Sequence, residues 1–125
     1  MNSKGNKGFL IKKRLQSFIY AFNGVMHMIR TQHNSRIHIG AGVLAVVLGL
    51  LLKISITEWI FIAIAIGIVI MAELFNTAFE QLVDLISPEI SDKAGNIKDV
   101  SAAAVLVASI TALIIGLIIF LPKIF

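Results

Sequence analysis

The most constraining feature of this sequence is an uncharged apolar segment, Val100 to Leu121, which is followed by Pro122. A helix needs about 20 mostly apolar residues to cross the hydrocarbon core of a bilayer, and this segment has that length. Because apolar residues surround the predicted helix on all sides, it has no polar face to turn to water in a small soluble bundle. We therefore predict a helix that spans a membrane.

Two shorter apolar segments precede it. The first runs from Ile37 to Leu52 and is interrupted only by His38, and the second starts near Trp59 and is uncharged until Glu73. Both reach the spanning length if their polar ends lie in the interface, and backbone that faces lipid must be helical. A soluble three-helix protein is the alternative. It is disfavoured because 58% of the 125 residues are hydrophobic, more than so short a chain can bury.

The segment before the first predicted span is too polar to cross a membrane. Its apolar residues recur at helical spacing, while Lys12, Lys13 and Gln16 fall mainly elsewhere on the helical wheel, which predicts an amphipathic surface helix. The expected fold is therefore all-α and integral to the membrane, in a single domain of residues 1–125. Its predicted parts are a flexible start at 1–8, a surface helix at 9–31, and spans at 35–53, 57–86 (with a cytoplasmic extension) and 97–121.

The distribution of basic residues predicts the orientation. Seven lysines and arginines precede the first apolar segment, which starts at Ile37, Lys53 lies between the first and second apolar segments, and Lys93 and Lys98 lie between the second and third. By the positive-inside rule, the N-terminus and the second connection are cytoplasmic. The net charge of +4 is thus explained by topology and by anionic lipid, and no nucleic-acid partner is expected. The chain has no cysteine, which excludes disulfide and thiolate chemistry.

A stripe of polar residues continues the second span. At 100° per residue, Glu73, Asn76, Glu80 and Asp84 fall within an arc of about 80° on the helical wheel. Carboxylates close to hydrocarbon are costly unless they are paired, so they suggest a functional site rather than only a solvated helix face. Oxygen ligands of this kind favour magnesium, and a proton or ion pathway is a second interpretation.

Lys98 and Asp99 open the third span and are followed by the small residues Ser101 to Ala104. Magnesium-binding acids with a lysine on the same membrane face suggest phosphate transfer, because that reaction depends on charge neutralisation and positioning. The sequence contains neither GxxxxGK[ST] nor GxGxxG, so a kinase here would use neither a P-loop nor a protein-kinase fold. The alternative for Lys98 and Asp99 is an ordinary helix start, with the acid complementing the helix dipole.

Taken together, these segments carry a family pattern. The motif E-x-x-N-T-A-x-E-x-x-x-D from Glu73 to Asp84, followed by Lys98, Asp99 and the Ser/Ala run, resembles the bacterial diacylglycerol kinases, a family that includes the Gram-positive undecaprenol kinases. The resemblance continues upstream and covers roughly residues 13–107. It implies a homotrimer in the bacterial inner (plasma) membrane that transfers the γ-phosphate of MgATP to the hydroxyl of diacylglycerol or undecaprenol. The implied active sites lie at the cytoplasmic face, between neighbouring protomers.

The resemblance also implies roles for individual residues. Glu73 matches the general base that takes the proton from the lipid hydroxyl, and Asn76 orients groups near the γ-phosphate. Glu80 matches a metal ligand. Lys98 contacts phosphate, and Asp99 belongs to the same site. The implied nucleotide-binding set also includes Asp84, an early basic residue at Lys13 or Arg14, and the aromatic Tyr20.

One position departs from the family pattern. Gln32 stands where the family usually has a glutamate that serves as a further metal ligand. An amide oxygen can coordinate magnesium but brings no charge, so we expect weaker metal binding. The departure leaves a weak or non-catalytic homologue as an alternative, beside a small ion or proton transporter. The three histidines lack metal-ligand spacing, and His38 is expected only to form a hydrogen bond at the membrane interface.

Overall fold

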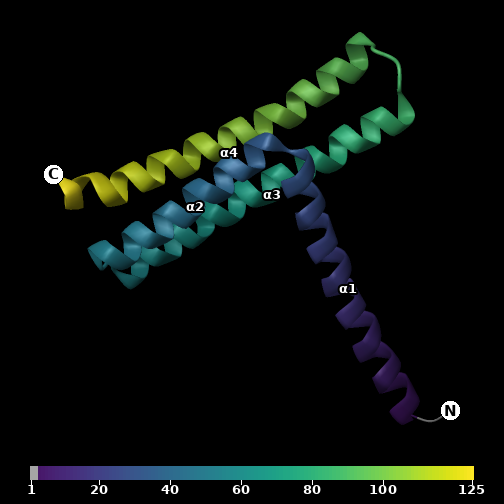
Figure 1. The fold of residues 1–125 in the computed structure, drawn as a ribbon, viewed down its shortest axis with the longest axis horizontal. Coiled ribbons are helices and arrows are strands. Elements are labelled where there is room, and N and C mark those ends of the chain that lie inside the picture. Colours follow the sequence, from purple (N-terminus) through teal and green to yellow (C-terminus); the bar gives the residue numbers. More distant parts are fainter. Residues whose placement is uncertain (1–2) are drawn as a thin grey trace.

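A computed structural model describes residues 3–125, which form four helices and no strand (Figure 1). The helices are α1 (Ser3–Thr31), α2 (His33–Leu52), α3 (Ile56–Ile86) and α4 (Asp92–Ile124). The last three are long and apolar enough to cross a membrane. The predicted all-helical membrane architecture is therefore confirmed.

Several helix ends differ from the prediction. Residues 3–8, predicted to be flexible, are helical, because the segment contains no proline and the hydrogen-bonding pattern of α1 continues through it. Residues 1–2 lie outside the described part. α4 begins at Asp92 rather than at residue 97, because the Ser91 hydroxyl accepts a hydrogen bond from the Ala94 N–H and caps the helix. It also continues through Pro122, and Lys123 in its last turn pairs with Glu58 of α3 at 3.2 Å.

A tight connection joins α2 and α3 at the end of the bundle remote from the polar stripe. Lys53 ends α2 in the left-handed conformation, with a φ of 51°. The Ser55 side chain then accepts a hydrogen bond from the Glu58 N–H, while the Glu58 side chain accepts one from the Ser55 N–H. This capping box satisfies two donors at the start of α3 and makes the reversal of direction compact.

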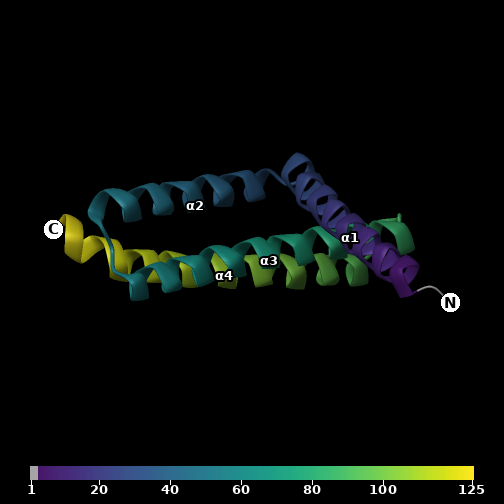
Figure 2. The same cartoon turned by 90° about the horizontal axis from the view of Figure 1, so that it is seen from below.

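α3 and α4 pack along each other, and α2 lies to one side of this pair (Figure 2). The buried apolar core near the α2–α3 connection contains Ile54, Ile62, Ile119 and Phe120. Many other large apolar side chains of the spans, such as Leu51 and Val107, are exposed. Such a surface fits a lipid environment or neighbouring protomers rather than water.

Gly49 allows α2 to approach this core. A Cβ atom placed there would lie 2.7 Å from Cη2 of Trp59 and 3.0 Å from Cδ1 of Ile54. Gly49→Ala should therefore lower the free energy of unfolding in detergent by about 1–3 kcal/mol. The matched control is Gly40→Ala on the same helix, where no atom lies within 4 Å. Equal melting temperatures for the two variants would contradict this packing.

α1 points away from the other three helices (Figure 1). The turn between α1 and α2 is held by side-chain hydrogen bonds to the last carbonyls of α1. Ser35 Oγ donates to the Met28 carbonyl at 3.2 Å, and Arg36 donates to the Ile29 and Arg30 carbonyls at 2.8 Å each. A cation at these carbonyls also complements the helix dipole. The turn is therefore defined, whereas the placement of α1 on a membrane surface stays a prediction.

Candidate active site

The polar stripe of α3 runs from a buried to an exposed environment. Glu73 and Asn76 are 2% and 7% exposed, Glu80 is half-buried, and Asp84 is exposed. All four lie toward the end of α3 that leads into the connection to α4. The stripe thus runs from the interior of the protein to its surface. A site that is reached both from the membrane and from water needs such an arrangement.

Gln32, in the turn between α1 and α2, is brought to Glu80. Its Nε2 donates a hydrogen bond of 2.8 Å to Glu80 Oε2. A second contact nearby joins His27 of α1 to Gln81 of α3. The two residues predicted as metal ligands therefore lie together, although they are 48 positions apart in the sequence.

This pair fits a magnesium ion that is held mainly by its nucleotide. Within residues 3–125 no group of three or more His, Cys, Asp or Glu side chains could hold a metal. Mg²⁺ usually needs only one or two protein carboxylates, because water and phosphate oxygens complete its octahedral shell. Glu80 supplies one carboxylate, and the Gln32 amide can rotate to present its oxygen. These two ligands are thus compatible with MgATP, but only one of them carries a negative charge.

Asn76 is fixed by α4. Ser101 Oγ donates a hydrogen bond of 2.8 Å to Asn76 Oδ1, and both side chains are buried. With its oxygen occupied, the Asn76 amide keeps its two N–H groups for another acceptor. In the sequence, Ser101 is distinguished only as one of the small residues that follow Asp99. Its hydroxyl faces the polar stripe of α3, and no sequence pattern indicates that contact.

Asp84 and Lys98 form an ion pair at the exposed end of the site. Lys98 Nζ lies 2.6 Å from Asp84 Oδ1, and the two side chains are 40% and 66% exposed. A pair this exposed contributes only about 0–1 kcal/mol to stability. Both groups are therefore free to rearrange around a charged ligand at little cost to the fold.

Glu73 is the most deeply buried charged side chain of the site. Its Oε1 has no hydrogen-bond partner within the described residues. The side chain that faces this oxygen is His38 of α2, whose Nε2 lies 3.4 Å from Glu73 Oε1, close enough for an ion pair but without the alignment of a hydrogen bond. An ionised carboxylate in such surroundings costs several kcal/mol unless it is compensated. A carboxyl group at a position this buried points to a functional role.

The remaining predicted residues are not brought to the stripe. Lys13, Arg14 and Tyr20 are exposed on the part of α1 that points away from the bundle (Figure 1). Asp99 is exposed on α4. The roles assigned to these four residues stay predictions, because a single protomer does not join them to Glu73 and Glu80.

The fold and the stripe define a small three-span membrane protein with an acidic, partly buried site at one end of its spans. The family model of prokaryotic diacylglycerol kinase matches residues 19–120. The chain therefore belongs to this family of lipid kinases, as the residue pattern predicted.

Three relatives extend this result. An undecaprenol kinase of Bacillus subtilis is 39% identical over 123 residues, which cover 98% of this chain and 99% of that protein. A diacylglycerol kinase of Synechocystis sp. is 38% identical over 109 residues, which cover 86% and 62% of the two chains. A diacylglycerol kinase of Escherichia coli is 35% identical over 74 residues, which cover 59% and 61%.

Proposed function

We propose that this lipid kinase transfers the γ-phosphate of MgATP to undecaprenol in preference to diacylglycerol, at the acidic stripe of α3. The observation that carries the site is the burial of the Glu73 carboxylate next to the Glu80–Gln32 pair. The preference for undecaprenol is supported by the full-length similarity to the undecaprenol kinase, since the diacylglycerol kinases match over smaller shares of their chains.

In this proposal Glu73 is the general base. The hydroxyl oxygen of the lipid forms a bond to the γ-phosphorus, the bond from that phosphorus to the bridging oxygen of ADP breaks, and the hydroxyl proton passes to Glu73. The burial of Glu73 keeps water away from the reacting atoms. Glu80 and Gln32 would hold Mg²⁺, which supplies charge neutralisation for the phosphates when it is bound.

The other polar residues of the site bind and orient the nucleotide. Asn76, held by Ser101, presents its N–H groups to the γ-phosphate. Lys98 leaves Asp84 to contact phosphate oxygens, and Asp84 and Asp99 belong to the nucleotide site. Phosphoryl transfer depends chiefly on such positioning and charge neutralisation, so a site without a covalent nucleophile is sufficient.

We also propose that the active unit is a homotrimer in the bacterial plasma membrane, with its sites on the cytoplasmic side. The exposed apolar faces of the spans support contacts between protomers. Lys13, Arg14 and Tyr20 lie on α1, which points away from the other three helices (Figure 1). Their position supports a site that is completed by a neighbouring chain. The excess of lysine and arginine before α2 supports a cytoplasmic N-terminus.

The proposed substrate preference is tested by incubating the purified protein with MgATP and each lipid separately in mixed micelles. We expect kcat/KM to be higher for undecaprenol, with undecaprenyl phosphate as the product. A higher kcat/KM for diacylglycerol would contradict the preference but not the kinase activity. Proton flux in proteoliposomes without nucleotide, together with no transfer to either lipid, would instead favour a transporter.

A charge added at position 32 should strengthen metal binding. Gln32→Glu places a second carboxylate beside Glu80, and we expect it to lower the Mg²⁺ concentration for half-maximal rate by about three- to tenfold, since ligand charge tunes affinity. Gln16→Glu, which adds the same charge on an exposed part of α1, is the matched control. A magnesium titration unchanged by Gln32→Glu would remove Gln32 from the metal site.

A further inference from the structure

His38 faces the buried carboxylate from another helix. Its Nε2 lies 3.4 Å from Glu73 Oε1, the oxygen that has no hydrogen-bond partner in the described part of the chain. The His38 side chain is 24% exposed and that of Glu73 is 2% exposed. His38 lies in the second turn of α2. The hydrogen bond expected of His38 at the membrane interface stays a prediction.

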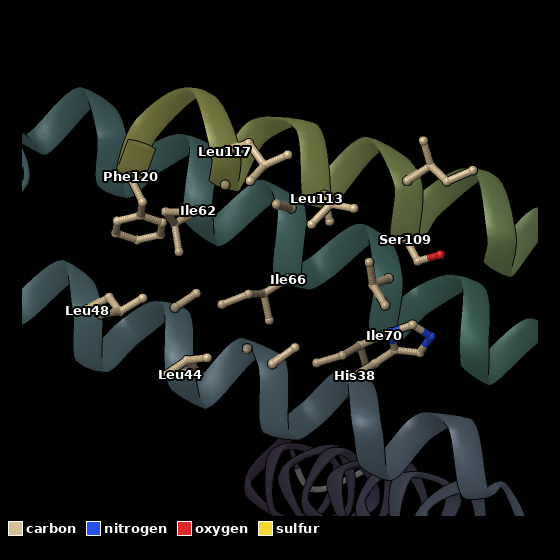
Figure 3. A pocket seen from close by; sticks show the side chains of 18 of the residues that line it. His38, Leu44, Leu48, Ile62, Ile66, Ile70, Ser109, Leu113, Leu117 and Phe120 are labelled. Atoms are coloured by element: carbon tan, nitrogen blue, oxygen red, sulfur yellow. The ribbon is translucent and has the colours of Figure 1, made fainter. Parts of the chain in front are cut away.

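The other side of His38 borders an apolar groove. The groove has a volume of about 580 Å³ and lies between α2, α3 and α4. Figure 3 shows His38 at one end, near Ile70 and Ser109, with Leu48 and Phe120 toward the other end. His38 and Ser109 are the polar residues among those that line it. The imidazole thus stands between an apolar space in the membrane region and the proposed base.

We propose that His38 is a positioning residue for Glu73; this role rests on the proposed kinase function. The imidazole Nε2–H donates to Glu73 Oε1 and so leaves Oε2 directed at the lipid hydroxyl. Without this donor, the buried Glu73 Oε1 has no hydrogen-bond partner within the described residues to fix its orientation. The separation of 3.4 Å agrees with this role, because catalytic hydrogen bonds are often long in ligand-free enzymes and shorten when substrate binds.

The chemistry of the contact predicts different effects for two substitutions. His38→Leu removes the donor, and we expect kcat to fall about 100-fold, as misplacement of a reacting group by roughly 1 Å does. His38→Gln keeps an N–H donor of similar reach, and its kcat should stay within about fivefold of the wild type. The KM for ATP should change less than about twofold in both variants, because neither touches the nucleotide residues.

Two controls separate positioning from a structural role. His33→Leu removes an exposed histidine of the same helix and should leave kcat unchanged. His38→Leu made in the Glu73→Gln background should add little further loss, because residues that act as a unit are not additive. Melting temperatures in detergent report whether each variant is folded.

The measurement is kcat and KM for ATP-dependent lipid phosphorylation by these variants. A selective fall in kcat for His38→Leu, restored by His38→Gln and absent in the Glu73→Gln background, supports the role. Equal losses in the leucine and glutamine variants, an effect on KM alone, or an additive effect in the Glu73→Gln background overturns it. A wild-type protein that transfers no phosphate overturns the proposed function itself, whereas an active wild type with unaffected His38→Leu overturns only the role of His38.

Discussion

Glu73→Gln is expected to lower the rate of phosphate transfer about 10³-fold, within the range that general-base catalysis contributes. The amide has nearly the same shape as the carboxylate but cannot take the proton of the lipid hydroxyl. Stability should not fall, because a neutral amide is less costly to bury than a charge at a position that is 2% exposed. The measurement is label transfer from ATP to lipid in mixed micelles, together with a melting curve of the same preparation.

The control for this prediction is Glu89→Gln, which neutralises an exposed acid in the connection between α3 and α4. It should keep the wild-type rate. Near-normal turnover of Glu73→Gln would refute the assignment of the base. A loss of rate accompanied by unfolding would instead assign Glu73 a structural role, against the present interpretation.

Lys98→Met should lower kcat/KM for ATP about 100-fold, which is typical for removal of one group that stabilises developing negative charge. The substitution also breaks the ion pair with Asp84, but that pair is exposed and contributes little to stability. The melting temperature should therefore hardly change. Steady-state rates at varied ATP concentration provide the measurement.

Lys93→Met is the matched control, because Lys93 is an exposed lysine in the first turns of the same helix. We expect its kinetics to match those of the wild type. If both lysine variants lost the same activity, the effect would be one of general surface charge. If Lys98→Met lost stability but not activity, its pair with Asp84 would be structural.

Much of the fold was predictable because lipid imposes a simple rule. A segment without charge from Val100 to Leu121 has few options other than a spanning helix. The ends of the helices were less predictable, since they depend on local caps. The Ser91 cap places the start of α4 at Asp92, earlier than predicted. The N-terminal segment contains no proline, and α1 therefore starts at Ser3.

The site was predictable where it follows one helix. The positions of Glu73, Asn76, Glu80 and Asp84 on one face follow from the helical repeat alone. Contacts between helices depend on how each helix is rotated and displaced against its neighbours, which periodicity does not specify. The family resemblance indicated that Gln32 belongs near Glu80. Nothing indicated that Ser101 would hold Asn76 or that His38 would face Glu73.

A structure with a bound ligand would show whether the acidic stripe of α3 is the phosphate-transfer site. The protein would be solved in a membrane mimetic with Mg²⁺, a non-hydrolysable ATP analogue and the lipid. We expect the terminal phosphate to lie between Lys98 and the Glu80–Gln32 pair, with the lipid hydroxyl at Glu73. A nucleotide bound away from this stripe, or a Glu73 carboxylate turned toward the acyl chains, would contradict it.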